Sequence, residues 1–164
     1  MLQRVRIALL GVWLGLMALF TFVVAPAAFA ALPSHLAGEL VSRVLSSVEI
    51  AGILIGVILL ICLASEALKQ RRVAALGEGI LLALMTLSAL VSRFVVSARL
   101  HAIRLLTGES IASLPSGDPV RSTFDTLHQT SVGLMGFNLL AAIVLLAILV
   151  SRVRRRGSAI PPSN

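Results

Sequence analysis

Residues 118–138, DPVRSTFDTLHQTSVGLMGFN, continue without a break into the apolar run LLAAIVLLAILV. Polar and apolar side chains recur here at steps of 4, 3, 4 and 3, at Phe124, His128, Ser131, Met135 and Asn138. This spacing places the five side chains on one face of an α-helix. The stretch therefore predicts a helix that carries a histidine, a hydroxyl and an amide into an apolar region.

The composition predicts a membrane protein. The 164 residues are 58% hydrophobic and 13% charged, whereas about a quarter of an average soluble domain is charged. Several apolar runs exceed the roughly 18 residues that mark a spanning helix. We expect spanning helices at about residues 7–32, 44–64, 73–98 and 130–150. The predicted fold is all-α, an integral membrane four-helix bundle formed by one domain (residues 1–156) and followed by a disordered tail (157–164).

Basic residues gather beside the predicted spans. The formal net charge is +7, and nine of the fourteen basic residues are Arg4, Arg6, Lys69, Arg71, Arg72, Arg152, Arg154, Arg155 and Arg156. Such flanks are typical of orientation signals and of contacts with anionic lipid head groups. Four spans place these flanks on one side, so we expect both termini in the cytoplasm and the protein in a bacterial inner membrane. No aromatic-studded basic face accompanies the charge, so we expect no nucleic-acid partner.

The first apolar run has two interpretations. Its basic start and the sequence Ala28-Phe29-Ala30 are similar to a secretory signal with its cleavage site. However, the run from Ile7 to Leu32 has 26 residues, whereas a signal core has about 7 to 15. We favour a retained helix in which Pro26 either introduces a kink or marks the outer turn.

Two pairs of glycines predict where the helices approach closely. Gly11 and Gly15 lie in the first run, and Gly52 and Gly56 lie in the second. Glycines four residues apart leave a helix face on which a neighbouring helix can pack. We expect the bundle to pack through these four positions.

Two charged residues interrupt the predicted spans. Glu49 lies in the second span and Arg93 in the third, and such charges cost about 2.5–3.5 kcal/mol each unless they face a partner or a cavity. The topology places both in the outer half of the bilayer, within about one helical turn of the depth of Asn138. We predict an outer-leaflet polar cluster of Glu49, Arg93 and Asn138, with His128 and Ser131 nearer its mouth.

This cluster has a structural and a functional explanation. Glu49 and Arg93 can form a buried ion pair that fixes helix register, or the cluster can bind or pass an ion, a proton or a small polar ligand. Glu66 and Glu78, near the inner surface, are expected to pair with a basic group of the flank at Lys69, Arg71 and Arg72.

The third span is expected to continue outward as an amphipathic helix. Arg93, Ser97, His101 and Arg104 recur at steps of 4, 4 and 3 and so share one face. We expect an amphipathic, partly helical loop at residues 99–129 on the outer side, covering the polar cluster.

Metal and catalytic motifs are missing from the sequence. His35, His101 and His128 are the weak candidates for metal ligands, but they show no paired ligand spacing, and the single Cys62 excludes a thiolate cluster. No nucleophile elbow, zinc-protease motif or phosphate loop occurs. We expect no metal, no cofactor and no enzymatic activity.

Two motifs resemble a known family. The first is L-P-x-H-x-x-G at Leu32, Pro33, His35 and Gly38, and the second is D-P followed by F-x-x-x-H-x-x-S at Asp118, Pro119, Phe124, His128 and Ser131. With the proline-containing first helix, they are similar to the transmembrane protein 205-like family, also called domain of unknown function 4149. The resemblance covers about residues 7–150. It implies four membrane helices and an uncharacterised activity.

Some members of that family are discussed in connection with heavy-metal tolerance, which slightly favours transport or metal handling. Our first hypothesis is therefore a small transporter or permeation-type protein for an ion, metal or small solute, acting alone or as a homo-oligomer. The alternative is a non-transporting structural or accessory membrane protein that binds a partner through its outer loop.

Overall fold

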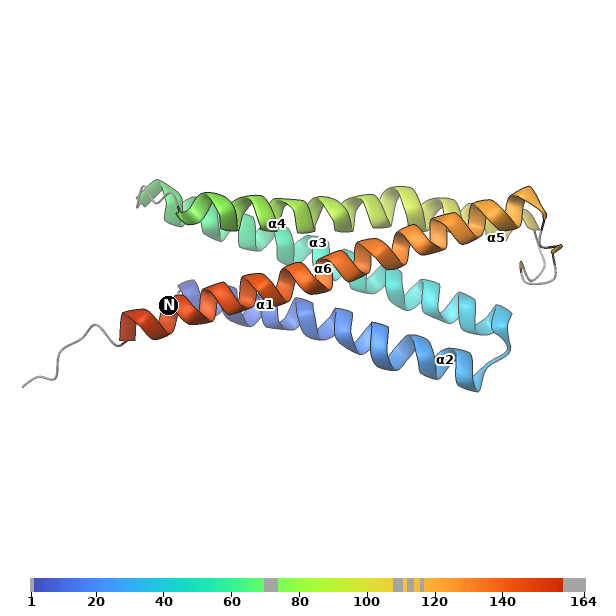
Figure 1. Ribbon diagram of the computed structural model, residues 1–164, viewed down its shortest axis with the longest axis horizontal. Coiled ribbons are helices and arrows are strands. Elements are labelled where there is room, and N and C mark those ends of the chain that lie inside the picture. The colour runs from blue at the N-terminus through green and yellow to red at the C-terminus, as the bar shows by residue number, and fades with distance from the viewer. Residues whose placement is uncertain (1, 70–73, 108–110, 112–113, 116, 158–164) are drawn as a thin grey trace, which may run out of the picture.

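The computed structural model describes residues 2–69, 74–107, 111, 114–115 and 117–157. Its helices are α1 (Leu2–Leu19), η1 (Phe20–Val24), α2 (Ala25–Ala31), α3 (Ser34–Lys69), α4 (Ala74–Val91), η2 (Ser92–Ser97), α5 (Ala98–Thr107) and α6 (Pro119–Gly157). The segments α1, η1 and α2 follow one another directly, as do α4, η2 and α5, so the chain forms four long helical rods (Figure 1). Each rod contains a helix long and apolar enough to cross a membrane. The prediction of an all-α chain with four apolar spans is confirmed.

The four rods lie side by side in an up-and-down arrangement. α3 packs on α1 and α4, and α6 packs on the same two helices. The start of α1 and the end of α6 lie at one end of the bundle, called here the terminal end; α2 and α5 lie at the other, called the loop end (Figure 1). Large apolar side chains remain exposed on every rod, for example Phe22, Ile61, Ile80 and Leu140. An outer surface of this kind fits a bilayer better than water.

Two helices begin where the sequence supplies a start signal. α6 begins at Pro119, and the backbone N–H of Val120 donates to Oδ1 of Asp118 over 2.7 Å. This confirms that Asp118 and Pro119 open a helix. α3 begins at Ser34, directly after Pro33 and well before the predicted span, and the stretch from Ser34 to Arg43 contains no proline that would end it.

Two π-helical segments interrupt the α-helical rods. In η1 the N–H of Ala25 donates to the carbonyl of Phe20, five residues back. This wider turn lies directly before Pro26, which has no N–H and whose ring crowds the preceding α-helical turn. The predicted disturbance at Pro26 thus takes the form of a π turn, and the rod continues to Ala31.

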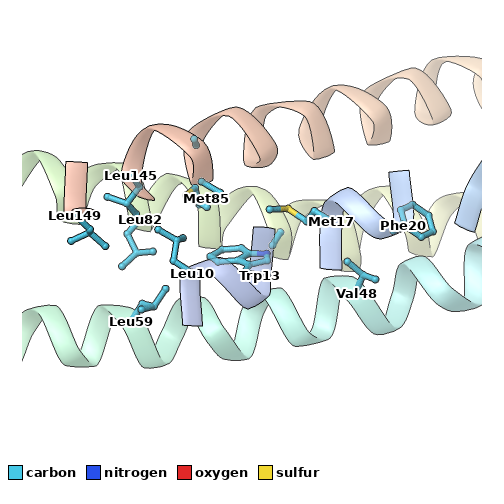
Figure 2. Close-up of a cluster of buried hydrophobic side chains, with 13 residues drawn as sticks. Leu10, Trp13, Met17, Phe20, Val48, Leu59, Leu82, Met85, Leu145 and Leu149 are labelled. Carbon is cyan, nitrogen blue, oxygen red and sulfur yellow. The ribbon is translucent and has the colours of Figure 1, made fainter. Parts of the chain in front are cut away.

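The core is built from apolar side chains of all four rods. Leu10, Trp13, Met17 and Phe20 follow one another along the inner face of the first rod and meet side chains of α3, α4 and α6 (Figure 2). Their steps of 3, 4 and 3 are those of one helical face. Trp13 is 2% exposed, so the centre of the bundle is organised around an indole ring.

Of the two predicted glycine pairs, one lies at a close contact between helices and the other does not. A Cβ added at Gly52 would lie 2.5 Å from Nε1 of Trp13, and one at Gly56 would lie 2.4 Å from Oγ1 of Thr86. The second pair therefore makes the predicted close approach. At Gly11 and Gly15 an added Cβ would meet no atom of the described residues within 4 Å. The prediction that this first pair packs helices within the chain is wrong.

Candidate functional site

The carboxylate of Glu49 lies inside the bundle and is held by two serines. Glu49 is 4% exposed. The hydroxyl of Ser92 donates to its Oε1 over 2.5 Å, and the hydroxyl of Ser97 lies 3.0 Å from Oε1 and 3.1 Å from Oε2. Both serines belong to η2, at the two limits of that segment.

The π turn explains why both serines reach one carboxylate. Residues five positions apart in an α-helix point about 140° away from each other, because 3.6 residues make one turn. In a π-helix the hydrogen bond spans five residues, so residues five apart lie close to one turn apart. η2 thereby brings Ser92 and Ser97 to the same side, facing α3.

The same turn changes the position of Arg93. α-Helical spacing predicted that Arg93 and Ser97 share a face, but the wider turn pairs Ser97 with Ser92 instead. The guanidinium of Arg93 is half-buried and lies 5.9 Å from the ring centroid of Phe94. Among the described residues, the ion pairs do not include Glu49 with Arg93. The direct ion pair of the structural explanation is not formed.

A small cavity adjoins Glu49. Its volume, measured as the space open to the centre of a water molecule, is about 20 Å³. This is enough for about one water-sized guest. The lining comes from all four rods and comprises Trp13, Met17, Val48, Glu49, Ala89, Ser92, Met135 and Asn138.

Asn138 presents an unpaired oxygen in this region. It is 5% exposed, and its Nδ2 donates to Oγ of Ser88 over 3.2 Å. Its Oδ1 is buried and has no hydrogen-bond partner among the described residues. A buried carbonyl oxygen without a donor costs about 1–3 kcal/mol. A proton donor or a cation that contacts this oxygen would therefore stabilise the protein.

The structure therefore brings together part of the predicted cluster. Glu49 and Asn138 line one cavity, whereas His128 lies ten residues from Asn138, or about 15 Å along α6 at 1.5 Å per residue, and its side chain is exposed. Ser131 is buried, 6% exposed, between these two positions but outside the cavity lining. Sequence reasoning missed Ser88 and Ser92, and it assigned Ser97 to the amphipathic face with Arg93 and not to Glu49. The signal was present, since Ser88 and Ser92 lie four residues apart in an apolar run.

The motif residues gather at the loop end. The ring of Phe124 stacks on that of His128 with centroids 6.3 Å apart, and the guanidinium carbon of Arg104 lies 5.3 Å from the Phe124 centroid. A Cβ added at Gly38 would lie 3.7 Å from Nη2 of Arg104. Arg104 therefore links motif residues of α3 and α6.

The three histidines that were weak candidates for metal ligands, His35, His101 and His128, are exposed. Within the part of the chain that the structure describes, no three His, Cys, Asp or Glu side chains come close enough to hold a metal ion. Exposed His35 lies near the start of α3.

A second polar group closes the terminal end. Arg6 of α1 donates through Nη1 to Oε2 of Glu66 over 2.7 Å and through Nη2 to Oε1 of Glu78. Nη1 of Arg152 donates to Oε2 of Glu78 over 2.5 Å. Each of the four rods contributes one residue to this set, which we call the terminal ion-pair network (Arg6, Glu66, Glu78 and Arg152).

The terminal ion-pair network gives Glu66 and Glu78 partners that the sequence did not predict. Among the described residues these partners are Arg6 and Arg152. The pairing expected with the flank after α3 stays a prediction, because Arg71, Arg72 and the side chain of Lys69 lie outside the described residues. Arg6 and Arg152 reach the glutamates because the starts of the first and third rods and the ends of the second and fourth meet at one end of the bundle.

The chain was compared with known proteins and families. Neither the curated proteins nor the solved structures give a match. A family described as domain of unknown function (DUF4149) matches residues 8–107. This range includes the motif residues Pro33, His35 and Gly38 as well as Glu49, Ser92 and Ser97. The motif from Asp118 to Ser131 lies beyond the matched range. The chain is a multi-pass helical protein that belongs to the DUF4149 family.

Proposed function

We propose that this protein is a small transporter or permeation-type protein for an ion or small solute, and that Glu49 is its central binding group. One observation carries the proposal: Glu49, whose buried carboxylate has no ion pair among the described residues, lines a cavity together with Asn138, whose buried Oδ1 has no hydrogen-bond partner there. Intramembrane acidic residues commonly mark ion and proton pathways. The proposed activity is movement of this ion or solute across the bilayer, and it involves no enzymatic reaction.

The orientation follows from the basic flanks. The terminal end, which carries Arg4, Arg6 and the arginines after Val150, faces the cytoplasm, and the loop end faces outward. In a bacterial cell this places the protein in the inner membrane, with anionic lipid head groups around the flanks. In this orientation the predicted amphipathic cover at residues 99–129 lies on the outer side.

A flux assay tests the proposal. The purified chain is reconstituted into proteoliposomes, and uptake is measured under gradients of sodium, potassium, protons or copper. Glu49→Gln keeps the side-chain size but removes the charge, and should lower the flux at least tenfold. The matched control is Glu39→Gln, because Glu39 is exposed and pairs only with Arg43 of its own helix among the described residues. Flux that Glu49→Gln leaves unchanged, or no flux under any gradient, contradicts the proposal.

The alternative is an accessory protein that binds a partner at the loop end. The observation that favours it is an exposed apolar pair on α5, where Leu105 is 70% and Leu106 is 87% exposed. Such side chains beside exposed Arg99 and His101 offer a contact surface. Absence of flux, combined with cross-linking of a cysteine placed at Leu106 to one discrete partner, would favour this function.

A further inference from the structure

The polar atoms of the cavity lining are acceptors, apart from the indole N–H of Trp13, which is a donor. Asn138 uses its Nδ2 on Ser88, so its Oδ1 remains as an acceptor. Ser92 donates its proton to Glu49, so its oxygen retains lone pairs. Glu49 adds carboxylate oxygens. A guest that contacts the oxygens of Glu49, Ser92 and Asn138 must therefore be a proton donor or a cation.

The charge around the cavity indicates the charge of the guest. Glu49 is the one ionisable residue in the lining given by the described residues. α1 contributes Trp13 and Met17, and α6 contributes Met135 and Asn138, all uncharged. The nearby cation is Arg93 on η2, which lies against Phe94 and outside ion-pair distance of Glu49. A single positive charge would balance the site, whereas a divalent ion would leave an excess charge in a low-dielectric region.

The size and chemistry of the lining restrict the guest further. The volume of about 20 Å³ admits one water-sized particle and excludes an organic cation. The lining has carboxylate, amide and hydroxyl oxygens, which are ligands of hard cations, and also the thioethers of Met17 and Met135, which are ligands of soft metals. The charged group is the carboxylate of Glu49, which favours a hard cation, and silver ions test the soft alternative. A small alkali cation meets the charge, the size and the ligand type together.

We propose that Glu49, Ser92 and Asn138 form a binding site for one dehydrated sodium ion. The ion fills the cavity, neutralises Glu49 and gives Oδ1 of Asn138 its missing partner. The site deepens the proposed function by naming its ion class, and it rests on that function for its physiological role.

The test is a thermal unfolding series on the detergent-solubilised full chain. Sodium, potassium and choline chloride are compared at constant ionic strength and pH, because an ion that binds only the folded state raises the unfolding midpoint. Sodium at a hundredfold excess over its Kd should raise the midpoint by about 5–10 °C. Potassium should give less, and choline none.

Variants identify the site. Asn138→Leu and Glu49→Gln should each abolish the sodium-dependent shift, and Glu39→Gln should keep it. If either of the first two fails to fold, Ser92→Ala and direct binding of radioactive sodium provide the same comparison. An equal shift with all three salts, or a sodium response that Glu49→Gln and Asn138→Leu retain, overturns the proposal. So does a response to pH or to silver ions without a response to sodium.

The outcomes also separate this site from transport. Sodium-specific stabilisation without flux under any gradient supports the sodium site and contradicts the transport function. Solute flux that does not depend on sodium, without sodium-dependent stabilisation, supports the transport function and contradicts the sodium site.

Discussion

Substituting Glu78 by glutamine tests whether the terminal ion-pair network holds the bundle together. The side chain of Glu78 is 2% exposed, that of Arg6 is 5% exposed, and Glu78 binds both arginines of the network. Removing one partner of a buried pair costs about 3–5 kcal/mol, because the other charge stays buried without compensation. Glu66 still pairs with Arg6, but its side chain is 38% exposed, so its contribution is at most about 1 kcal/mol. We expect Glu78→Gln to lower the free energy of unfolding by about 3 kcal/mol.

The measurement is reversible unfolding of the purified chain in mixed micelles, with the denaturing detergent as the variable. Glu39→Gln is the matched control, since it breaks an exposed pair four residues apart on one helix, for which about 0.3–0.5 kcal/mol is typical. The double variant Arg6→Met, Glu78→Leu should recover most of the loss, because it leaves no buried charge. A Glu78→Gln variant as stable as Glu39→Gln would refute the structural role of the network.

Two further pairs of variants compare neighbouring positions. Gly52→Ala should lower the free energy of unfolding by about 1–3 kcal/mol because the methyl group meets Trp13, whereas Gly15→Ala should leave it unchanged and alter only self-association, measured by cross-linking. Equal stabilities of the two variants would contradict the packing described. Ser92→Ala should cost about 1.5–3 kcal/mol, as expected for a hydrogen bond to a charged group, and Ser97→Ala should cost less because its bonds to Glu49 are longer and less buried. The reverse order would show that η2 is not arranged as described.

The helical spans could be predicted because they depend on composition and length alone. The helix start at Pro119 also follows from local chemistry. By contrast, the direction of the side chains in η2 could not be predicted from a period of 3.6 residues. One wider turn between Ser92 and Ser97 rotates everything after it, and neither the apolar period nor the spacing of polar residues indicates a π turn. The π turn explains why Ser97 shares a face with Ser92 instead of Arg93, whereas the expected ion pair of Glu49 and Arg93 was inferred from depth, which does not fix the direction of a side chain.

The terminal ion-pair network was open to prediction but was missed. Arg6 and Glu78 lie near the starts of the first and third rods, and Glu66 and Arg152 lie near the ends of the second and fourth. In an up-and-down bundle these four positions share one depth. Arg6 was predicted to belong to a flank that contacts lipid head groups. That prediction rests on the number of basic residues beside a span, which does not indicate the direction of any one side chain.

The two polar groups of the bundle differ in how their charges are compensated. In the terminal ion-pair network two arginines face two glutamates, and each of the two carboxylates forms at least one ion pair. Glu49 instead receives two hydroxyl hydrogen bonds, with a cavity and an unpartnered amide oxygen beside it. A group that only fixes helix register is expected to be fully paired, since each unpaired buried charge lowers stability. The structural explanation therefore fits the network, and the cavity beside Glu49, which lowers stability unless something fills it, favours a binding role.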